Sequence, residues 1–227
     1  MHELSAKNRK ISDMFSSIAP TYDLLNHYLS FNIDKLWRKK AVSMLGGKNA
    51  LDVATGTCDI AIEALNRVES VVGVDLSIGM LNMGAKKIVG KNIDLVCAAA
   101  ENLPFKDETF DNVIIAFGIR NVPDKISALY EFKRVLKPKG RLVILEFNKP
   151  IYKTFGAMYN FYSSVFLPFL GRLISGNKSA YTYLPSSIKY FPDVDFLKSM
   201  MERAGFTNVF YVPLTFGISF IHSGIKE

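Results

Sequence analysis

A glycine-containing turn, followed by an aspartate nineteen residues after the glycine, has the clearest chemical potential in this sequence. The turn runs from Asp52 to Asp59, and Gly56 within it would let the backbone approach a ligand closely. Asp75 ends an apolar run, where its carboxylate could take two ribose hydroxyls. Sites for dinucleotides and for S-adenosylmethionine share this arrangement. The alternative is a tight turn and a solvated aspartate, because the full G-x-G-x-x-G pattern is absent.

The elements that would position this turn alternate between strands and helices. Helices are expected between the strands, and Ser77 is expected to cap one of them. A further helix is expected over residues 193–204. The apolar runs lack period-two alternation, as expected of strands that are buried on both faces. The pattern predicts an α/β fold with a doubly wound, mostly parallel, Rossmann-like sheet. Its strands are expected at residues 50–54, 71–75, 94–98, 110–117 and 141–147, with strand-like runs at 209–214 and 217–223.

Two further segments flank this core. Residues 1–45 have helical periodicity with a turn near Asn32, which predicts an N-terminal helical lid. The segment from Phe147 to Pro192 carries five basic residues, no Asp or Glu, and twelve of the 28 aromatic residues. Polar residues, Gly and Pro interrupt it, so it is interpreted as a helical insert that caps the sheet rather than a membrane span. One domain is expected over 1–227, with the lid at 1–45, a cofactor-binding core at 46–147, the insert at 148–192 and a C-terminal helix and strand hairpin at 193–227.

The composition limits the kinds of partner and the cellular compartment that are expected for this protein. The net charge of +7 and the pI of 9.3 suit anionic partners such as nucleic acid, a phospholipid surface or a phosphorylated ligand. A hydrophobic content of 49% excludes a disordered chain. The two cysteines and the absence of a signal-peptide pattern predict a cytoplasmic protein with reduced thiols. The three histidines and the cysteines lack metal-ligand spacing, so no metal is expected.

Later motifs resemble a known class of enzyme. The succession Ala98–Phe105, Asp107–Asp111 and Leu136–Leu142 resembles class I S-adenosylmethionine-dependent methyltransferases. Stretches spread over nearly the whole chain resemble the menaquinone/ubiquinone biosynthesis C-methyltransferase family, which includes demethylmenaquinone methyltransferase. The most specific of them are Gly118-Ile-Arg-Asn121 and the Tyr-x-x-x-Ser-Ile run that ends at Ile188, and others are Phe15–Asp23 and Leu145–Pro150. The sequence departs from the family at Thr55 and Cys58, where glycine is usual.

The resemblance implies the reaction and its cofactor. S-Adenosylmethionine would donate the methyl group, without a metal, to a ring carbon of a polyprenylated hydroquinone. Demethylmenaquinol is the favoured substrate, and 2-methoxy-6-polyprenyl-1,4-benzoquinol is the alternative. The cofactor-binding residues carried over from the family are Gly56, Thr57, Asp75, Leu76, Ala99, Ala100 and Ala116. Alanine at 99 and 116, where the family often has polar residues, would leave backbone contacts to hold the cofactor.

Four residues are candidates for catalysis. Arg120, with Asn121 beside it, follows the fourth predicted strand. An arginine cannot act as a base because its pKa exceeds about 12, so Arg120 would stabilise the developing oxyanion or orient a water, unless it only forms a salt bridge. Tyr22 and Asp23 in the lid are further candidates, Asp23 as proton acceptor or merely as a helix cap. Glu146 and His27 have weaker claims.

The partners follow from the same resemblance. The insert could line a tunnel for the isoprenoid tail and meet anionic headgroups, which predicts weak, peripheral attachment to the cytoplasmic face of the inner membrane. A homodimer is an open alternative to a monomer. No nucleic-acid partner is expected, because no appended RNA-binding module is recognisable. An RNA methyltransferase, a methyltransferase for another phenol, and a non-catalytic scaffold of a quinone-biosynthesis complex stay open as alternatives.

Overall fold

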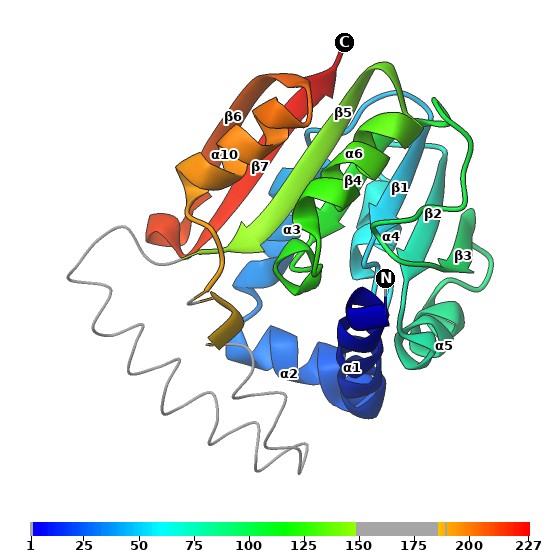
Figure 1. The fold of residues 1–227 in the computed structure, drawn as a ribbon. Coiled ribbons are helices and arrows are strands. Elements are labelled where there is room, and N and C mark those ends of the chain that lie inside the picture. The colour runs from blue at the N-terminus through cyan, green and yellow to red at the C-terminus, as the bar shows by residue number, and fades with distance from the viewer. Residues whose placement is uncertain (1, 149–185, 189) are drawn as a thin grey trace.

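The computed structural model describes residues 2–148, 186–188 and 190–227, and their strands form one sheet (Figure 1). The strand order is β3-β2-β1-β4-β5-β7-β6. Neighbours among β1 to β5 are parallel, whereas β7 is antiparallel to both β5 and β6. The predicted doubly wound, mostly parallel sheet is therefore confirmed. The strands are β1 (Asn49–Val53), β2 (Ser70–Asp75), β3 (Ile93–Cys97), β4 (Phe110–Ala116), β5 (Leu136–Phe147), β6 (Phe206–Leu214) and β7 (Ser219–Lys226).

Polar side chains cap several of the described helices at their first turn. Ser77 accepts a hydrogen bond from the N–H of Met80, as predicted, and Asp124 and Asp193 cap the later helices in the same way. The turn predicted near Asn32 is confirmed, since Asn32 has a left-handed φ of 60°. A second break in the lid was not predicted: a short 3₁₀ turn containing Pro20 separates the first two helices. The helices are α1 (His2–Ile18), α2 (Tyr22–Leu29), α3 (Ile33–Val42), α4 (Asp59–Ala64), α5 (Ile78–Lys87), α6 (Lys125–Val135) and α10 (Val194–Arg203).

The sheet is buried on both faces, which explains the unbroken apolar runs of its strands. One face packs against α6 and α10, for example through Phe132 and Leu197. The opposite face packs against α3 and α4, for example through Trp37 and Ala61. Alternate residues of β4 serve the two cores: Val113 and Ile115 face the first, and Ile114 faces the second. Apolar side chains in each core are removed from water when the chain folds, which stabilises the sheet from both faces.

Strand β5 begins earlier than predicted. Helix α6 ends at Val135, and Leu136 already pairs with Phe110 of β4. The ladder resumes with Arg141 opposite Asn112 after a register shift. Lys139 takes a left-handed φ of 64° in the irregular stretch. Residues 137–140 are therefore an irregular, bulged extension of β5. Strand β6 also begins earlier than predicted, at Phe206, whereas β7 begins later than predicted, at Ser219, and continues to Lys226.

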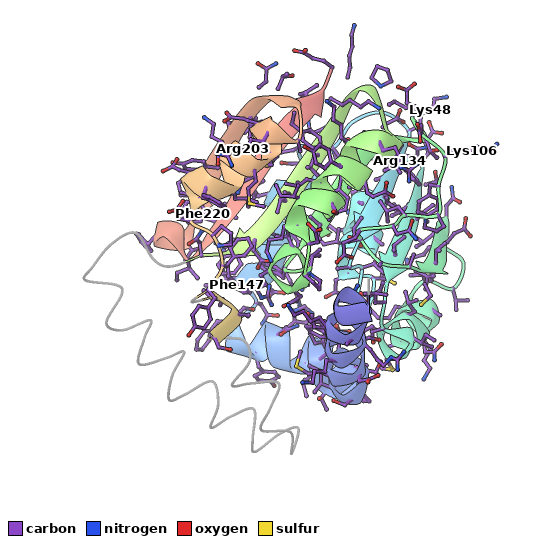
Figure 2. All side chains as sticks on the ribbon, viewed as in Figure 1. Lys48, Lys106, Arg134, Phe147, Arg203 and Phe220 are labelled. Atoms are coloured by element: carbon purple, nitrogen blue, oxygen red, sulfur yellow. The ribbon has the colours of Figure 1, made fainter. Side chains whose placement is uncertain are left out.

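The first two helices lie across the carboxyl ends of the parallel strands (Figure 1). Phe147 lies at that end of the sheet, and Lys48 lies at the opposite end (Figure 2). The insert predicted over 148–192 lies outside the described residues for most of its length. Within the described ranges, no helix is long and apolar enough to cross a membrane.

Candidate active site

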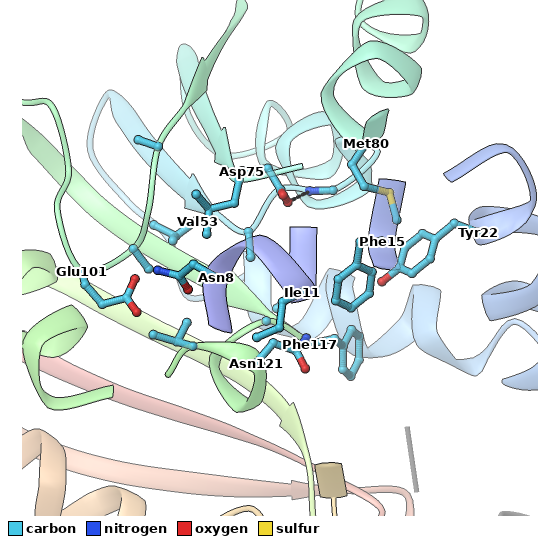
Figure 3. Close-up of a pocket in the computed structure, with 18 residues that line it drawn as sticks. Asn8, Ile11, Phe15, Tyr22, Val53, Asp75, Met80, Glu101, Phe117 and Asn121 are labelled. Carbon is cyan, nitrogen blue, oxygen red and sulfur yellow. Dashed lines mark hydrogen bonds between the residues drawn. The ribbon is translucent and has the colours of Figure 1, made fainter. Parts of the chain in front are cut away.

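A cavity opens at the carboxyl edge of the sheet, between β1 and β4, where the strand order reverses (Figure 3). Open α/β sheets bind ligands at such switch points. Helix α1 covers the cavity, and the turns that follow β1, β2, β3 and β4 form its floor. The lining residues are Asn8, Ile11, Phe15, Tyr22, Val53, Ala54, Gly56, Asp75, Leu76, Met80, Ala98, Ala100, Glu101, Ala116, Phe117, Gly118, Asn121 and Val122.

Asp75 ties the turn after β1 to the end of β2. One carboxylate oxygen accepts the N–H of Gly56 at 2.9 Å, and the other accepts the N–H of Ser77 at 2.8 Å. Desolvation raises the pKa of Asp75, although these N–H donors oppose the rise. A carboxylate offers about four acceptor positions, so lone pairs are left for hydroxyl groups of a ligand. A Cβ on Gly56 would meet no atom within 4 Å, so the turn leaves open space beside Asp75.

The two departures from glycine in this turn are accommodated away from the cavity. The Thr55 hydroxyl donates to Asp52 at 2.6 Å, and neither Thr55 nor Cys58 lines the cavity. Cys58 adopts a left-handed φ of 70°, and its sulfur occupies the space that a Cβ on Gly84 would need. The added side chains therefore do not reduce the space for a ligand. The left-handed conformation of Cys58 is a local strain that glycine would not have.

A polar cluster joins α2, which belongs to the predicted lid, to the turn after β1. The Thr57 hydroxyl donates to Asp23 of α2, and the ammonium of Lys87 at the end of α5 donates to Asp23 at 2.9 Å and also to Asp59. Burial favours a lower pKa for Lys87, but the two carboxylates outweigh it and raise the pKa. Burial likewise opposes ionisation of Asp59, yet Arg38 and Lys87 hold its pKa below the usual range. We call Asp23, Thr57, Asp59 and Lys87 the lid cluster.

Residues of α2 and α3 extend this cluster outwards. His27 Nδ1 lies 2.9 Å from Asp34, whose carboxylate also pairs with Arg38 at 3.0 Å. Arg38 reaches Asp59 at 2.6 Å. Helices α2, α3, α4 and α5 are thus connected through charged side chains at the edge where the cavity lies.

Arg120 lies beside the cavity rather than in its lining. Its Nη1 donates to Glu146 and to the carbonyl of Phe117, both at 2.6 Å, and the two charged side chains are only 6% and 2% exposed. Its Nε is buried and has no hydrogen-bond partner among the described residues. The guanidinium also lies 5.5 Å from the ring centroid of Phe147. The neighbouring Asn121 does line the cavity.

The cavity includes some of the residues expected from the sequence and not others. It is lined by Gly56, Asp75, Leu76, Ala100, Ala116, Tyr22 and Asn121. It is not lined by Thr57, Ala99, Asp23 or Arg120, of which Thr57 and Asp23 belong to the lid cluster. Sequence reasoning missed Asn8, Ile11 and Phe15, although their spacing of three and four residues marks one face of a helix. It also missed Glu101, the acidic residue directly after Ala100.

The described residues contain no group of three or more His, Cys, Asp or Glu side chains that could hold a metal ion. They do fit a nucleoside cofactor. Asp75 has free acceptor positions, Gly56 leaves open space beside it, and a buried carboxylate oxygen of Glu101 lacks a partner in the described part of the chain.

Comparison with solved structures places this fold among known enzymes. An S-adenosylmethionine-dependent methyltransferase of Thermotoga maritima superposes with a TM-score of 0.71 at 21% identity, covering 96% of this chain and 100% of that one. A phosphoethanolamine N-methyltransferase of Haemonchus contortus, in complex with S-adenosylmethionine, gives 0.60 at 15% identity and covers 81% of this chain and 49% of that one. The fold is that of the class I S-adenosylmethionine-dependent methyltransferases.

Sequence comparison identifies the family. A model of the ubiE/COQ5 methyltransferase family matches residues 3–226, and the chain belongs to that family. A ubiquinone/menaquinone biosynthesis C-methyltransferase, UbiE, of Geobacter sulfurreducens is 45% identical over 100% of this chain and 92% of its own length. The UbiE protein of Francisella philomiragia is 44% identical over 97% of this chain and 92% of its own length. The prediction of an S-adenosylmethionine-dependent C-methyltransferase is thereby confirmed.

Proposed function

We propose that this enzyme methylates a ring carbon of a polyprenylated hydroquinone in quinone biosynthesis, with demethylmenaquinol as the leading substrate. Membership of the ubiE/COQ5 family supports the reaction class. The observation that carries the proposal is the lining of the cavity, which has Asp75 and open backbone in its middle and aromatic side chains at one end. That end, formed by Phe15, Tyr22 and Phe117, suits a planar aromatic ring.

Asp75 and Gly56 are proposed to hold the cofactor. The free acceptor positions of Asp75 would take the ribose hydroxyls, and the open space at Gly56 would admit the rest of the molecule close to the backbone. Leu76, Ala100 and Ala116 supply small or apolar surface around it. When bound, S-adenosylmethionine supplies a methyl group on a sulfonium that a nucleophilic ring carbon can attack.

The chain's task at the substrate end is to favour the phenolate, because ionising a ring hydroxyl places negative charge on the ring carbon. Desolvation raises the pKa of Tyr22 in spite of the opposing charges of Arg120 and Arg38, so its hydroxyl stays protonated and can donate to an oxyanion. Glu146 fixes Arg120 beside the cavity rather than in its lining, and from there Arg120 would favour the oxyanion through its positive charge. Asn121 adds an amide at the cavity wall. The hydroxyl proton would pass to water.

The lid cluster is proposed to hold α1 and α2 over the bound cofactor. Thr57 belongs to the cofactor turn and Asp59 to the helix after it, and Lys87 donates to both and also to Asp23 of the lid. In this role Thr57 and Asp23 act by positioning the cavity wall. Their contacts favour a closed lid that excludes water from the reacting atoms.

Association with a membrane surface is proposed through α2 and α3. Tyr28, Phe31 and Leu36 are 69%, 73% and 64% exposed, and Lys35 and Lys39 on α3 are also exposed. Apolar and basic side chains on one surface are typical of peripheral binding to anionic lipid, at about 1 kcal/mol per basic residue. Because the substrate carries an isoprenoid tail, attachment at the cytoplasmic face would bring the cavity close to it. Flotation of the protein with phosphatidylglycerol vesicles should decrease in a Phe31→Ser, Leu36→Ser double variant, and equal flotation would contradict this role.

The function is tested by a methyl-transfer assay with the purified protein. S-Adenosylmethionine is supplied with reduced demethylmenaquinone in one arm and with a 2-methoxy-6-polyprenyl-benzoquinol in the other. Methylation of the first substrate alone assigns menaquinone synthesis, and methylation of both assigns a dual enzyme. If S-adenosylmethionine binds and neither quinol reacts, the quinol proposal is wrong. Absence of cofactor binding would instead favour a non-catalytic scaffold.

A further inference from the structure

The backbone of Phe117 is strained at the point where this residue lines the cavity. Phe117 directly follows β4 and has a left-handed φ of 56°. Of the described non-glycine residues with a left-handed φ, only Ala54 and Phe117 belong to the cavity lining. This conformation is costly for a residue with a Cβ, whereas glycine adopts it freely. Strain of this kind persists where the surrounding structure imposes it, and it is concentrated at functional sites. A large aromatic side chain at this position therefore points to a use for its ring.

Contacts with both neighbouring strands hold the Phe117 backbone in place. Its N–H donates to the carbonyl of Leu145 on β5 at 2.7 Å, and its carbonyl accepts Nη1 of Arg120 at 2.6 Å. The next residue, Gly118, lies so close to the turn after β1 that an added Cβ would come within 2.6 Å of the Cβ of Ala54. Strand β4 lies between β1 and β5 in the sheet. The structure on both sides of β4 therefore limits how far the Phe117 ring can move.

Other aromatic rings support the ring of Phe117. Phe147 stacks on it with the ring centroids 4.5 Å apart and 30° between the planes, and the centroid of Trp37 lies 6.2 Å away. Neither of these two residues belongs to the lining that the described residues form, so Phe117 is the ring of this stack that reaches the cavity. Figure 3 shows Phe117 beside Phe15 and Tyr22 at one end of the cavity. A planar ring that enters this end would extend the stack of Phe117 and Phe147.

We propose that Phe117 is a specificity-determining residue, whose ring stacks on the substrate and favours a bicyclic quinol over a monocyclic one. The inference rests on the proposed function, which places the quinol at this end of the cavity. Offset-stacked rings attract each other beyond the burial of their apolar area, and a second, fused ring offers a further aromatic face for this contact. Because the backbone of Phe117 is held on both sides, its ring cannot move far to follow a smaller substrate.

The test compares the binding of two quinones that cannot be methylated, in the presence of S-adenosylhomocysteine. The bicyclic probe is 2,3-dimethyl-1,4-naphthoquinone and the monocyclic probe is tetramethyl-1,4-benzoquinone, so a fused ring replaces two methyl groups. Both quinone rings are fully substituted and do not add to the exposed Cys97 thiol. Trp37 is the single tryptophan of the sequence and lies against Phe117, so a quinone stacked on Phe117 should quench its fluorescence. The half-saturating quinone concentration then gives the affinity without relying on turnover.

The wild-type protein should bind the bicyclic quinone about fivefold more tightly, which is the contribution of one aromatic pair. In Phe117→Leu, which keeps an apolar side chain and removes the ring, the ratio should fall below about twofold. Phe117→Tyr keeps the ring and should keep the wild-type ratio. Phe105→Leu is the matched control, because Phe105 packs edge-on against Phe110 at 5.1 Å and lies outside the cavity lining of the described residues. It should also keep the wild-type ratio.

Each outcome decides the proposal. A ratio in Phe117→Leu equal to that of the wild type overturns it, and so does a decrease of the same size in Phe105→Leu. If Phe117→Leu does not fold by circular dichroism, Phe117→Met, which also lacks a ring, decides in the same way. Equal affinity of the wild-type protein for the two quinones overturns this inference alone. If neither quinone quenches Trp37 saturably although S-adenosylhomocysteine binds, the proposed function is overturned together with the inference.

Discussion

The lid cluster and the Arg120–Glu146 pair place oppositely charged groups at the same edge of the sheet, but in different environments. Lys87 and Asp23 of the lid cluster are 31% and 32% exposed and share several partners. Arg120 and Glu146 are 6% and 2% exposed and depend on each other. Partly solvated ion pairs contribute little free energy and respond to salt, whereas a buried charge that loses its partner is strongly destabilising. The partly exposed lid cluster is therefore suited to reversible closure. The buried Arg120–Glu146 pair is suited to a fixed position beside the substrate.

The largest effect is expected from Arg120→Ala, which leaves Glu146 buried without its partner. We expect the free energy of unfolding to decrease by about 3–5 kcal/mol. Turnover should decrease about a hundredfold or more if the guanidinium stabilises the oxyanion. Urea unfolding and turnover at saturating cofactor measure the two effects, and calorimetry with S-adenosylhomocysteine checks that the cofactor still binds.

The double variant Arg120→Met, Glu146→Leu distinguishes the contribution of Arg120 to stability from its contribution to turnover. Removing both charges should recover most of the lost stability, because no unpaired charge is left in the interior. Turnover should stay low, because the positive charge beside the substrate is missing. Recovery of both stability and turnover would show that Arg120 is only structural.

The second effect concerns Asp52, which lies below the cofactor turn and accepts the Thr55 hydroxyl. Burial raises the pKa of Asp52 from 3.8 to about 7. Between these values the folded state binds more protons than the unfolded state, so the free energy of unfolding should decrease as the pH rises from 4 to 7, by at most about 4 kcal/mol. Asp52→Asn should lose this dependence and become more stable relative to wild type as the pH rises. Urea unfolding at pH 4.5, 6 and 8 measures it, and a constant difference across the three pH values would contradict the raised pKa.

His222 on β7 should show the opposite dependence. Burial lowers its pKa from 6.5 to about 4, although its Nε2 bonds to the carbonyl of Val194 at 2.9 Å. The unfolded state binds the extra proton between these values, so this contribution to stability is lost as the pH falls from 6.5 to 4, by at most about 3 kcal/mol. In His222→Gln, the decrease in the free energy of unfolding between pH 7.5 and 4.5 should be smaller than in the wild type. Comparing the two pH values within each protein cancels the packing cost of the substitution, and equal decreases would exclude the role of His222.

The sheet could be predicted because each strand and each helix cap is marked by residues that are close together in the sequence. Buried parallel strands require apolar runs, and Ser77 shows its capping role within four residues of sequence. The lid cluster could not be predicted in this way: Asp23 and Lys87 are 64 residues apart, and helical periodicity does not show which faces meet. The Arg120–Glu146 pair is an intermediate case. Both residues follow or end neighbouring parallel strands, so their proximity could have been inferred once β4 and β5 were placed side by side.

Local sequence patterns also could not predict that the fold has room for the Cys58 side chain. The family resemblance implies glycine at this position, and the cysteine found there adds a Cβ to the cofactor turn. In the fold, the absent side chain of Gly84 leaves room for the Cys58 sulfur. Such compensation depends on a contact between the cofactor turn and α5, and a single sequence does not reveal it.

The smallest effect is expected from Lys87→Met, which removes the cation of the lid cluster and keeps most of its apolar length. Because Lys87 is partly exposed, the free energy of unfolding should decrease by only about 1 kcal/mol. The consequence for the lid should be clearer: chymotrypsin should cleave the segment containing Phe15 and Tyr22 faster, and S-adenosylhomocysteine should bind several-fold more weakly, with kcat nearly unchanged.

Lys86→Met is the matched control, because Lys86 is the exposed neighbour on the same turn of α5 and forms no ion pair within the described residues. It should behave as the wild type in both measurements. Raising the salt concentration to about 1 M shortens the range of charge interactions to about 3 Å and should reduce the difference between the Lys87 and Lys86 variants. The loss caused by Arg120→Ala should persist at the same salt concentration, since water and ions do not reach the buried pair. If salt weakened both effects equally, burial would not be what distinguishes the two sites.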